Sequence, residues 1–239
     1  MTTEAYSGYG TWKQWAPESF GACDSQQAAY FAAEIARANF GNLAGARVLE
    51  IGFGNGAFAD WCRKRGCNYS GTEVIQELVA RGRDTGFDMH VAGLSLDAIA
   101  PHGTVDLVAA WDVFEHIEIE SLRDVLLGVK AVLRQGGQLL ARFPSGDSPF
   151  SRSIQYGDLT HRTILGSSAV RQLAGEVGLR VEQIREPSFA YKGLPLVTTV
   201  RRLAVEFARR IAYPFLANVF MGGGAPVLTP NMVVVLVRE

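Results

Sequence analysis

Apolar residues along the chain recur at two different spacings. Residues 24–41 repeat them at helical intervals between Asp24 and Ser25, the two candidate caps, and Gly41, a helix stop, and so predict one helix. After it, short apolar runs predict strands at 46–52, 68–74, 105–117, 138–144, 179–186 and 231–239. Helical spacing between these runs predicts helices at 57–66, 75–84, 122–137 and 167–178. The alternation is typical of an α/β fold with parallel strands and crossover helices on both faces of the sheet.

An interruption at residues 188–228 separates the last two predicted strands. Its stretch 200–215 is amphipathic, with one face made of Val200, Leu203, Ala204, Phe207 and Ile211 and the other of Arg201, Arg202, Arg209 and Arg210. The uncharged residues after Arg210 include Pro214 and three consecutive glycines, which argues against a transmembrane helix. Residues 197–219 therefore have three possible neighbours: their own core, a second subunit in a homodimer, or a membrane surface.

The length of 239 residues suits one domain. We expect a helical cap or lid at 1–40, a core at 41–187 and 229–239, and an insertion at 188–228. The aromatic residues of the first segment are Tyr6, Tyr9, Trp12, Trp15 and Phe20. They suit a lid that excludes water and stacks on a sugar or ring, and they equally suit an ordinary N-terminal apron.

The decapeptide "VLEIGFGNGA" at 48–57 fits two nucleotide-binding patterns. Gly52, Gly54 and Ala57 match the G-x-G-x-x-A of dinucleotide-binding loops, whereas Glu50, Gly52, Gly54 and Gly56 match an E-x-G-x-G-x-G loop. Glu50 favours the second, because its carboxylate would repel a pyrophosphate but attract the ammonium and sulfonium of S-adenosylmethionine. A second acid ends the next strand, Glu73, and suits the ribose hydroxyls of either nucleotide.

Four stretches in order resemble the class I S-adenosylmethionine-dependent methyltransferases over about Val48 to Gly178. They are "VLEIGFGNG", "GTEV", "VDLVAAWDVFEHI" and "VLRQGGQLLARFP". The resemblance implies a doubly wound, Rossmann-like, seven-stranded sheet whose last strand is antiparallel. It also implies S-adenosyl-L-methionine as the cofactor, bound across the carboxyl ends of the first and fourth strands.

The resemblance assigns the cofactor to Glu50, Gly52, Phe53, Gly54, Gly56, Glu73, Leu94, Ser95, Trp111 and Asp112. Where the family commonly has an acid after the third strand, this chain has Leu94 and Ser95. Either their backbone groups or the side chain of Asp97 hold the adenine amine. Trp111 and Asp112 border the adenine and the methionine end, although Trp111 also suits the core.

The acceptor is expected to be a small molecule. Methyltransferases that act on nucleic-acid amines carry an "NPPY"-like loop after the fourth strand, where this chain has "WDVFEH", and its net charge of −1 offers no basic surplus for a phosphate backbone. "GDLTHR" at 157–162 resembles the D-x-x-H stretch of methyltransferases from bacterial polysaccharide gene clusters, which implies O-methylation of a sugar hydroxyl. A phenol or quinone-type metabolite is the alternative acceptor, and a non-catalytic domain that binds the cofactor is the alternative outside enzymes.

His161 is the predicted general base, with Asp158 orienting its ring. Both lie in a polar loop after the strand predicted at 138–144, and histidine's ordinary pKa of about 6.5 suits proton acceptance near neutral pH. His116 is either a second catalytic candidate or a histidine held by hydrogen bonds at a helix start. No metal ligand is predicted.

Cysteine content and the first residues bear on the compartment. Cys23, Cys62 and Cys67 form no C-x-x-C pair, which argues against a zinc site or a disulfide framework. The first ten residues have neither a basic nor an apolar signal region. We expect a cytoplasmic protein, with peripheral membrane contact as an option for residues 197–219.

Overall fold

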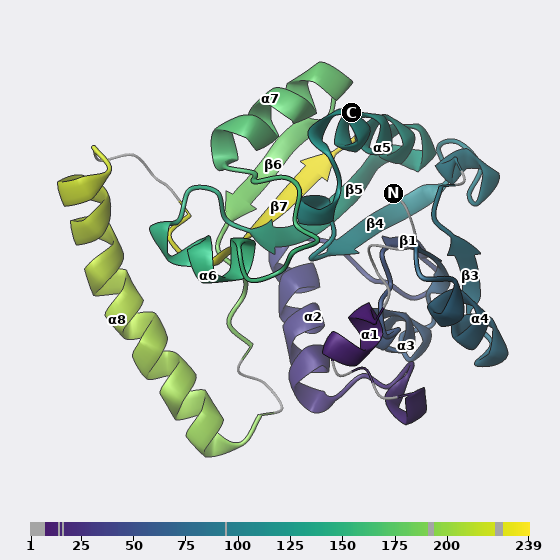
Figure 1. Ribbon diagram of the computed structural model, residues 1–239, viewed down its shortest axis with the longest axis horizontal. Coiled ribbons are helices and arrows are strands. Elements are labelled where there is room, and N and C mark those ends of the chain that lie inside the picture. Colours follow the sequence, from purple (N-terminus) through teal and green to yellow (C-terminus); the bar gives the residue numbers. More distant parts are fainter. Residues whose placement is uncertain (1–7, 14, 16, 94, 191–193, 223–226) are drawn as a thin grey trace.

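The strands form one seven-stranded sheet (Figure 1). The computed structural model describes residues 8–13, 15, 17–93, 95–190, 194–222 and 227–239. The strands are β1 Arg47–Ile51, β2 Asn68–Glu73, β3 Asp88–Val91, β4 Val105–Trp111, β5 Leu133–Pro144, β6 Arg180–Arg185 and β7 Asn231–Val237. Their order is β3-β2-β1-β4-β5-β7-β6, and β7 runs antiparallel to both of its neighbours. The predicted fold class, including the antiparallel last strand, is confirmed.

Eight α-helices fall within the described residues. They are α1 Tyr9–Trp12, α2 Ser25–Arg37, α3 Ala57–Arg63, α4 Gln76–Asp84, α5 Ile119–Val132, α6 Arg152–Gln155, α7 Ser167–Val177 and α8 Leu196–Phe220. Short 3₁₀ helices occupy Pro17–Ser19, Leu96–Ala98, Phe114–His116 and Pro149–Ser151. Asp24 caps α2 as its sequence predicts, since its Oδ1 accepts the amides of Gln26 and Gln27 at 2.7 and 2.8 Å.

Helices cover both faces of the sheet because alternate strand residues point to opposite sides. On one face, Val48 and Leu107 pack against Phe31 of α2 and Trp61 of α3. On the other face, sheet residues such as Leu139 pack against α5 and α7. The sheet is therefore buried on both sides, as its near-continuous apolar strands predict.

The helix predicted at 122–137 ends earlier, at Val132. Leu133 adopts extended angles, is fully buried and pairs with Val105 of β4. Pairing and burial of Leu133 outweigh the helical periodicity that continues through the sequence. The strand predicted at 105–117 likewise stops at Trp111, because Asp112 has a φ of 57° and turns the chain into the 3₁₀ helix at Phe114–His116.

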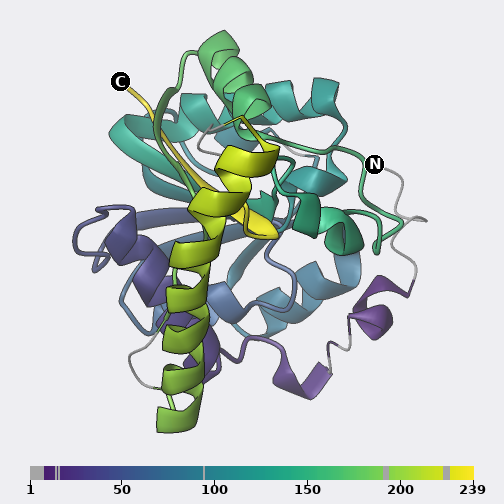
Figure 2. The ribbon, with the colours of Figure 1, turned by 90° about the vertical axis from the view of Figure 1, so that its left-hand side faces the viewer.

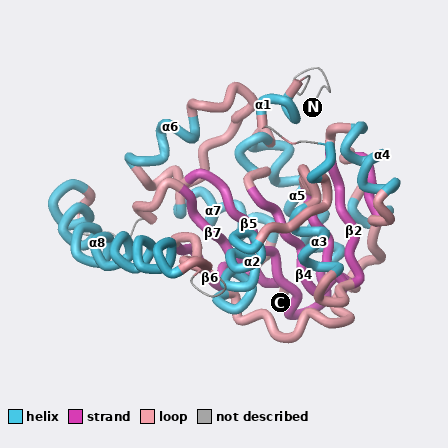
Figure 3. Tube along the Cα trace, turned by 90° about the horizontal axis from the view of Figure 1, so that it is seen from below, coloured by secondary structure: helices cyan, strands magenta, loops and turns pink. Residues whose placement is uncertain are grey.

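The segments that surround the site gather at one edge of the sheet. In Figure 3, α1 and α6 lie along the same edge although they are distant in sequence. The hydroxyl of Tyr9 in α1 donates to Oδ2 of Asp158, just after α6, at 3.3 Å, so the two segments are in contact. The N-terminal segment thus packs against the polar loop that follows β5.

Candidate active site

A cavity of about 940 Å³ opens at the carboxyl ends of β1, β2 and β4. Its walls include eight of the ten predicted cofactor residues: Glu50, Gly52, Phe53, Gly54, Glu73, Ser95, Trp111 and Asp112. Gly56 is not part of the lining and instead begins α3 as its N-terminal cap. Leu94 lies outside the described residues. In open α/β sheets this edge is where ligands bind.

The loop between β1 and α3 requires its glycines. Gly52, Gly54 and Gly56 have φ values of 70°, 54° and 76°, which side chains rarely tolerate. A Cβ on Gly52 would lie 2.6 Å from Cγ2 of Val113, and one on Gly54 would lie 3.1 Å from the ring of Trp15. Glycine at these positions therefore allows the loop to bring its backbone close to a ligand, whereas a larger residue would be strained.

The carboxylate of Glu73 holds this loop in place. Its Oε2 accepts the amide of Gly54 at 3.0 Å, and its Oε1 accepts the amides of Val74 and Ile75 at 2.7 and 3.2 Å. Burial raises the pKa of Glu73, and these three backbone hydrogen bonds counteract part of that rise. Since a carboxylate offers about four acceptor positions, Glu73 retains capacity for a ligand hydroxyl.

Glu50 lies deeper and is 2% exposed. Its Oε2 accepts the hydroxyl of Tyr69 at 2.5 Å. Burial raises the pKa of Glu50 to about 8; the Tyr69 hydrogen bond lowers it and the nearby Glu73 raises it further. A cationic ligand beside Glu50 would favour its ionised form and bring the pKa back down.

Trp111 and Asp112, at the end of β4, also line the cavity. Trp111 packs against Phe31 and Phe58 with ring centroids 5.3 and 5.4 Å away, so it belongs to the core as well as to the cavity. Its buried Nε1 has no hydrogen-bond acceptor among the described residues. Asp112 forms a two-point ion pair with Arg142, whose Nε lies 2.8 Å from Oδ1. Arg142, at the end of "QLLARFP", also lines the cavity and was missed by the sequence interpretation.

Ser95 and Asp97, which follow β3, lie differently with respect to the cavity. Ser95 lines the cavity, whereas Asp97 does not. The Asp97 carboxylate accepts the hydroxyl of Ser95 and pairs with Nε2 of His102 at 3.1 Å. Asp97 is thus occupied outside the cavity.

The three predicted catalytic residues come together. The amides of Arg162 and Thr163 donate to the carbonyl of Glu115 at 2.7 and 3.0 Å, which docks the loop after β5 onto the 3₁₀ helix at 114–116. This contact places the rings of His116 and His161 edge to face, with centroids 4.8 Å apart. Of the two, His116 lines the cavity and His161 lies outside the lining.

Hydrogen bonds fix the orientation of both imidazole rings. The Thr160 hydroxyl donates to Oδ1 of Asp158 at 2.5 Å, so its oxygen accepts Nδ1–H of His116 at 2.9 Å. His161 is held in the same way, because its Nδ1 lies 2.9 Å from the carbonyl oxygen of Gln155, which can only accept.

Charge at this cluster is unevenly distributed. Burial, together with the field of His161, lowers the pKa of His116 to about 4. Burial acts to raise the pKa of Asp158, but hydrogen bonds from Thr160 outweigh it and the pKa is lowered. The cluster therefore holds a neutral His116 beside an ionised Asp158 at neutral pH.

Glu115 adds a third side chain to the two histidines. Ligand atoms of Glu115, His116 and His161 lie within 4.8 Å of one another, an arrangement that could hold a metal ion, although the sequence predicted none. Burial and the charge of Asp112 raise the pKa of Glu115 well above its usual range. A cation at this position would have to displace the carboxyl proton first.

Described residues of the N-terminal segment contact this cluster and line the cavity. Nζ of Lys13 lies 3.5 Å from Oδ2 of Asp158, and the Tyr9 ring packs edge to face on His116 at 6.1 Å. Tyr9, Lys13 and Trp15 all line the cavity. Tyr6, the first of the predicted lid aromatics, lies outside the described residues.

Comparison with known proteins agrees with this geometry. The model of a methyltransferase domain family matches residues 23–184. The fold resembles a methyltransferase from Haloferax volcanii, solved with the Trm112 methyltransferase activator, with a TM-score of 0.64, 17% identity, and coverage of 99% of this chain and 97% of that one. It also resembles an S-adenosylmethionine-dependent methyltransferase from Mesorhizobium loti, with a TM-score of 0.61, 18% identity, and coverage of 90% and 100%.

A third structure contains the cofactor product. Geranyl diphosphate C-methyltransferase from Streptomyces coelicolor A3(2), solved with Mg²⁺, geranyl diphosphate and S-adenosyl-L-homocysteine, has a TM-score of 0.53, 15% identity, and coverage of 86% and 79%. A comparison with curated proteins gave no match.

The fold and the cavity define a class I S-adenosylmethionine-dependent methyltransferase. The chain belongs to the methyltransferase domain family, and its cofactor is S-adenosylmethionine. The cavity suits that molecule, because the two buried acids Glu50 and Glu73 line it and the glycine loop admits close backbone approach.

Proposed function

We propose that this enzyme methylates a hydroxyl oxygen of a small molecule, with a sugar hydroxyl as the favoured acceptor. The observation that carries the proposal is the neutral imidazole of His116 at the cavity wall, held by the Thr160 hydroxyl and packed edge to face on His161. A hydroxyl must lose its proton when it is methylated, and a positioned base contributes about 10² to 10⁴ in rate. An acceptor beside His116 would have such a base within reach.

The proposed cofactor residues contact different parts of S-adenosylmethionine. We propose that Glu73 accepts the ribose hydroxyls while it holds the glycine loop, and that Glu50 faces the cationic end. The backbone of Gly52, Phe53 and Gly54 approaches the ligand, and Gly56 acts indirectly by starting α3. Ser95 and Trp111 border the adenine, and Asp112, fixed by Arg142, borders the methionine end.

S-adenosylmethionine, held by Glu50, Glu73 and the glycine loop, would supply an electrophilic methyl carbon for transfer to the acceptor oxygen, with S-adenosylhomocysteine as the leaving group. The chain's own residues handle the proton. The imidazole of His116 takes it from the hydroxyl, and Asp158 stabilises the resulting imidazolium through Thr160. Nε2 of His161 also lies 3.8 Å from Oδ2 of Asp158. The prediction that His161 itself takes the proton stays open to test.

The segment 1–40 is proposed to act as a lid over the acceptor. The contacts of Tyr9 and Lys13 with Asp158, and of Trp15 with the glycine loop, support this role for its described part. Such a lid would exclude water from the proton transfer. The remaining units, a core at 41–187 and 229–239 and an insertion at 188–228, are kept as the proposed organisation of one domain.

Two measurements test the function. Mass spectrometry of small molecules released from the purified protein should find S-adenosylmethionine or S-adenosylhomocysteine. Transfer of a labelled methyl group to a panel of sugars, sugar nucleotides, lipid-linked sugars, phenols and amines should place the label on a sugar oxygen, with turnover unaffected by EDTA.

Other results of the panel point elsewhere. Label on a phenol would replace the sugar by an aromatic metabolite, and label on nitrogen or carbon would overturn O-methylation. Turnover that EDTA abolishes would assign Glu115, His116 and His161 to a metal ion instead of proton transfer. A bound cofactor with no transfer to any acceptor would support a non-catalytic binding domain.

A further inference from the structure

The helix α8 shows its apolar side to solvent. None of its residues is buried. Its apolar face consists of Leu196, Val197, Val200, Leu203, Phe207, Ile211 and Phe215, each at least half exposed. Helices of globular proteins normally turn this side toward the core. The expectation that the helix could dock on its own core by this face is therefore wrong.

The polar side of α8 faces the body of the protein instead. Nη1 of Arg202 donates to the carbonyl of Ala190 at 2.8 Å, and the guanidinium of Arg209 lies 5.1 Å from the ring centre of Phe189. Figure 2 shows α8 standing across the front of the molecule. Two of the four arginines that the sequence groups on one face thus serve to attach the helix.

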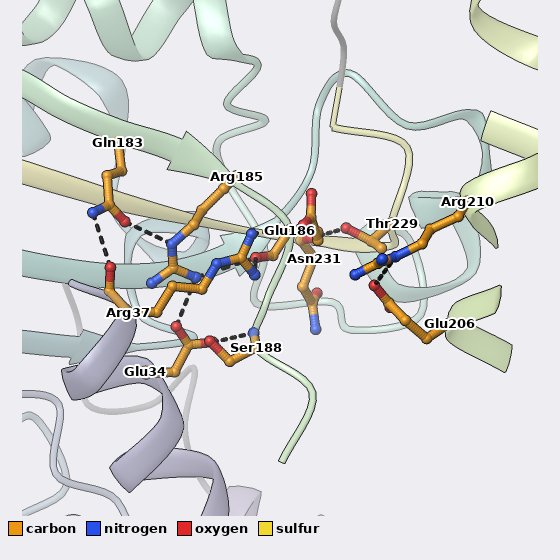
Figure 4. A network of polar contacts seen from close by, with 10 residues as sticks. All are labelled: Glu34, Arg37, Gln183, Arg185, Glu186, Ser188, Glu206, Arg210, Thr229 and Asn231. Carbon is orange, nitrogen blue, oxygen red and sulfur yellow. Dashed lines mark hydrogen bonds and ion pairs between the residues drawn. The ribbon is translucent and has the colours of Figure 1, made fainter. Parts of the chain in front are cut away.

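The chain leading to α8 is anchored before the helix begins. The Ser188 amide donates to Oε1 of Glu34 in α2 at 2.6 Å. Nη1 of Arg185 lies 2.8 Å from Oε2 of the same carboxylate, and Figure 4 shows both contacts. Arg37 pairs with Glu186 at 2.7 Å. Glu34 is fully buried, so its removal from these partners would be costly. The start of the insertion is therefore fixed to α2.

The remaining arginines flank the apolar face. On a helical wheel with about 100° per residue, Arg201 lies next to Ala208 at one edge of the apolar face. Arg210 lies next to Leu203 at the other edge. Both are exposed, and the side chain of Arg210 is 77% exposed beside Glu206, the single acid of the helix. Long cationic side chains at these edges can reach the charged layer above a buried apolar strip.

From this geometry we propose that α8 lies flat on an anionic lipid surface, with its apolar face among the acyl chains near the headgroups and Arg201 and Arg210 on the phosphates. Arg201 and Arg210, against the single glutamate of the helix, make the edges of the apolar face complementary to such a surface and repel the same edges of a second copy. Among the described residues, no helix is long and apolar enough to cross a membrane. The inference holds whichever acceptor the enzyme methylates.

Flotation of the full chain with vesicles tests the surface. The protein should bind vesicles of phosphatidylcholine mixed with phosphatidylglycerol, bind pure phosphatidylcholine more weakly, and release in high salt. Phe207→Asp with Ile211→Asp should abolish binding, and Arg201→Gln with Arg210→Gln should weaken it about thirtyfold. Val205→Asp is the matched control, since Val205 is 40% exposed but lies outside the apolar face, and it should bind normally.

Circular dichroism and thermal melting check that each variant is folded. Absence of binding to the anionic vesicles overturns the proposal, as does normal binding by the Phe207 and Ile211 double variant. If light scattering finds a dimer that this variant dissociates, while the wild type ignores vesicles, the face belongs to a second copy of the chain.

Discussion

The imidazole ring of His116 meets that of His161 edge to face, with centroids 4.8 Å apart. The pair lies where the loop after β5 docks onto the 3₁₀ helix after β4, with Asp158 and Thr160 behind it. One ring of the pair faces the cofactor cavity and the other does not. This asymmetry distinguishes two histidines that the sequence alone leaves as competing candidates for the base.

Replacing His116 by alanine should lower kcat by about 10²- to 10⁴-fold, because the acceptor proton loses its base. Affinity for S-adenosylmethionine should stay within a few-fold of wild type by calorimetry. His161→Ala is the matched control and should lose less turnover. A dead His161→Ala beside a near-normal His116→Ala would return the role of base to His161.

The pH dependence of kcat/KM should report the low pKa of His116. Burial and the field of His161 lower this pKa to about 4, so the neutral, active form persists down to that pH and is lost below it. Removing the field in His161→Ala should move the acidic limb to higher pH. An acidic limb near histidine's ordinary value of about 6.5 in the wild type would exclude His116 as the titrating base.

Glu73→Gln should weaken S-adenosylmethionine binding by about ten- to a hundredfold, since hydrogen bonds to a carboxylate contribute roughly 1.5 to 3 kcal/mol. The amide keeps the size of the side chain and one carbonyl acceptor for the loop, so circular dichroism should be unchanged. Glu77→Gln, at an exposed position of α4, is the control and should bind normally. An unaltered dissociation constant in Glu73→Gln would remove Glu73 from the ribose site.

Glu50 should link cofactor binding to pH. Its pKa is about 8 in the free protein because it is buried, so at neutral pH a cationic ligand must first displace its proton. Affinity should therefore increase from pH 6 toward about pH 8 and then level off, with proton release visible by calorimetry in buffers of different ionisation enthalpy. Glu50→Gln should bind more weakly and lose this dependence; a pH-independent wild type would contradict the assignment.

The same residue should reduce stability as pH rises. A carboxyl whose pKa is raised on folding stabilises the protein below its unfolded pKa of about 4.3 and loses that contribution up to its folded pKa of about 8. The free energy of unfolding should fall by about 1.4 kcal/mol per pH unit across this window from Glu50 alone. Urea titrations of the cofactor-free protein should show a shallower fall in Glu50→Gln, and equal slopes would refute the attribution.

The sequence by itself determined the alternating α/β layout and indicated a group of residues, among them Glu50 and Glu73, that line one cavity. Both signals consist of the spacing of residues that are close together in the chain, so they can be recognised in the sequence alone. They are the alternating strand and helix periods and the glycine loop between β1 and α3. Glu50 and Glu73 followed from the same logic, because each sits at the carboxyl end of a strand next to that loop.

Tertiary structure alone decided the rest. Which histidine faces the cavity depends on how the loop at 158–163 docks on Glu115, a contact between distant segments that has no periodic signal. Arg142 lines the cavity because β5 pairs with β4, which places Arg142 beside Asp112. Finally, the sequence of α8 is amphipathic whichever way it turns, and only its attachment through Arg202 and Arg209 directs the apolar face outward.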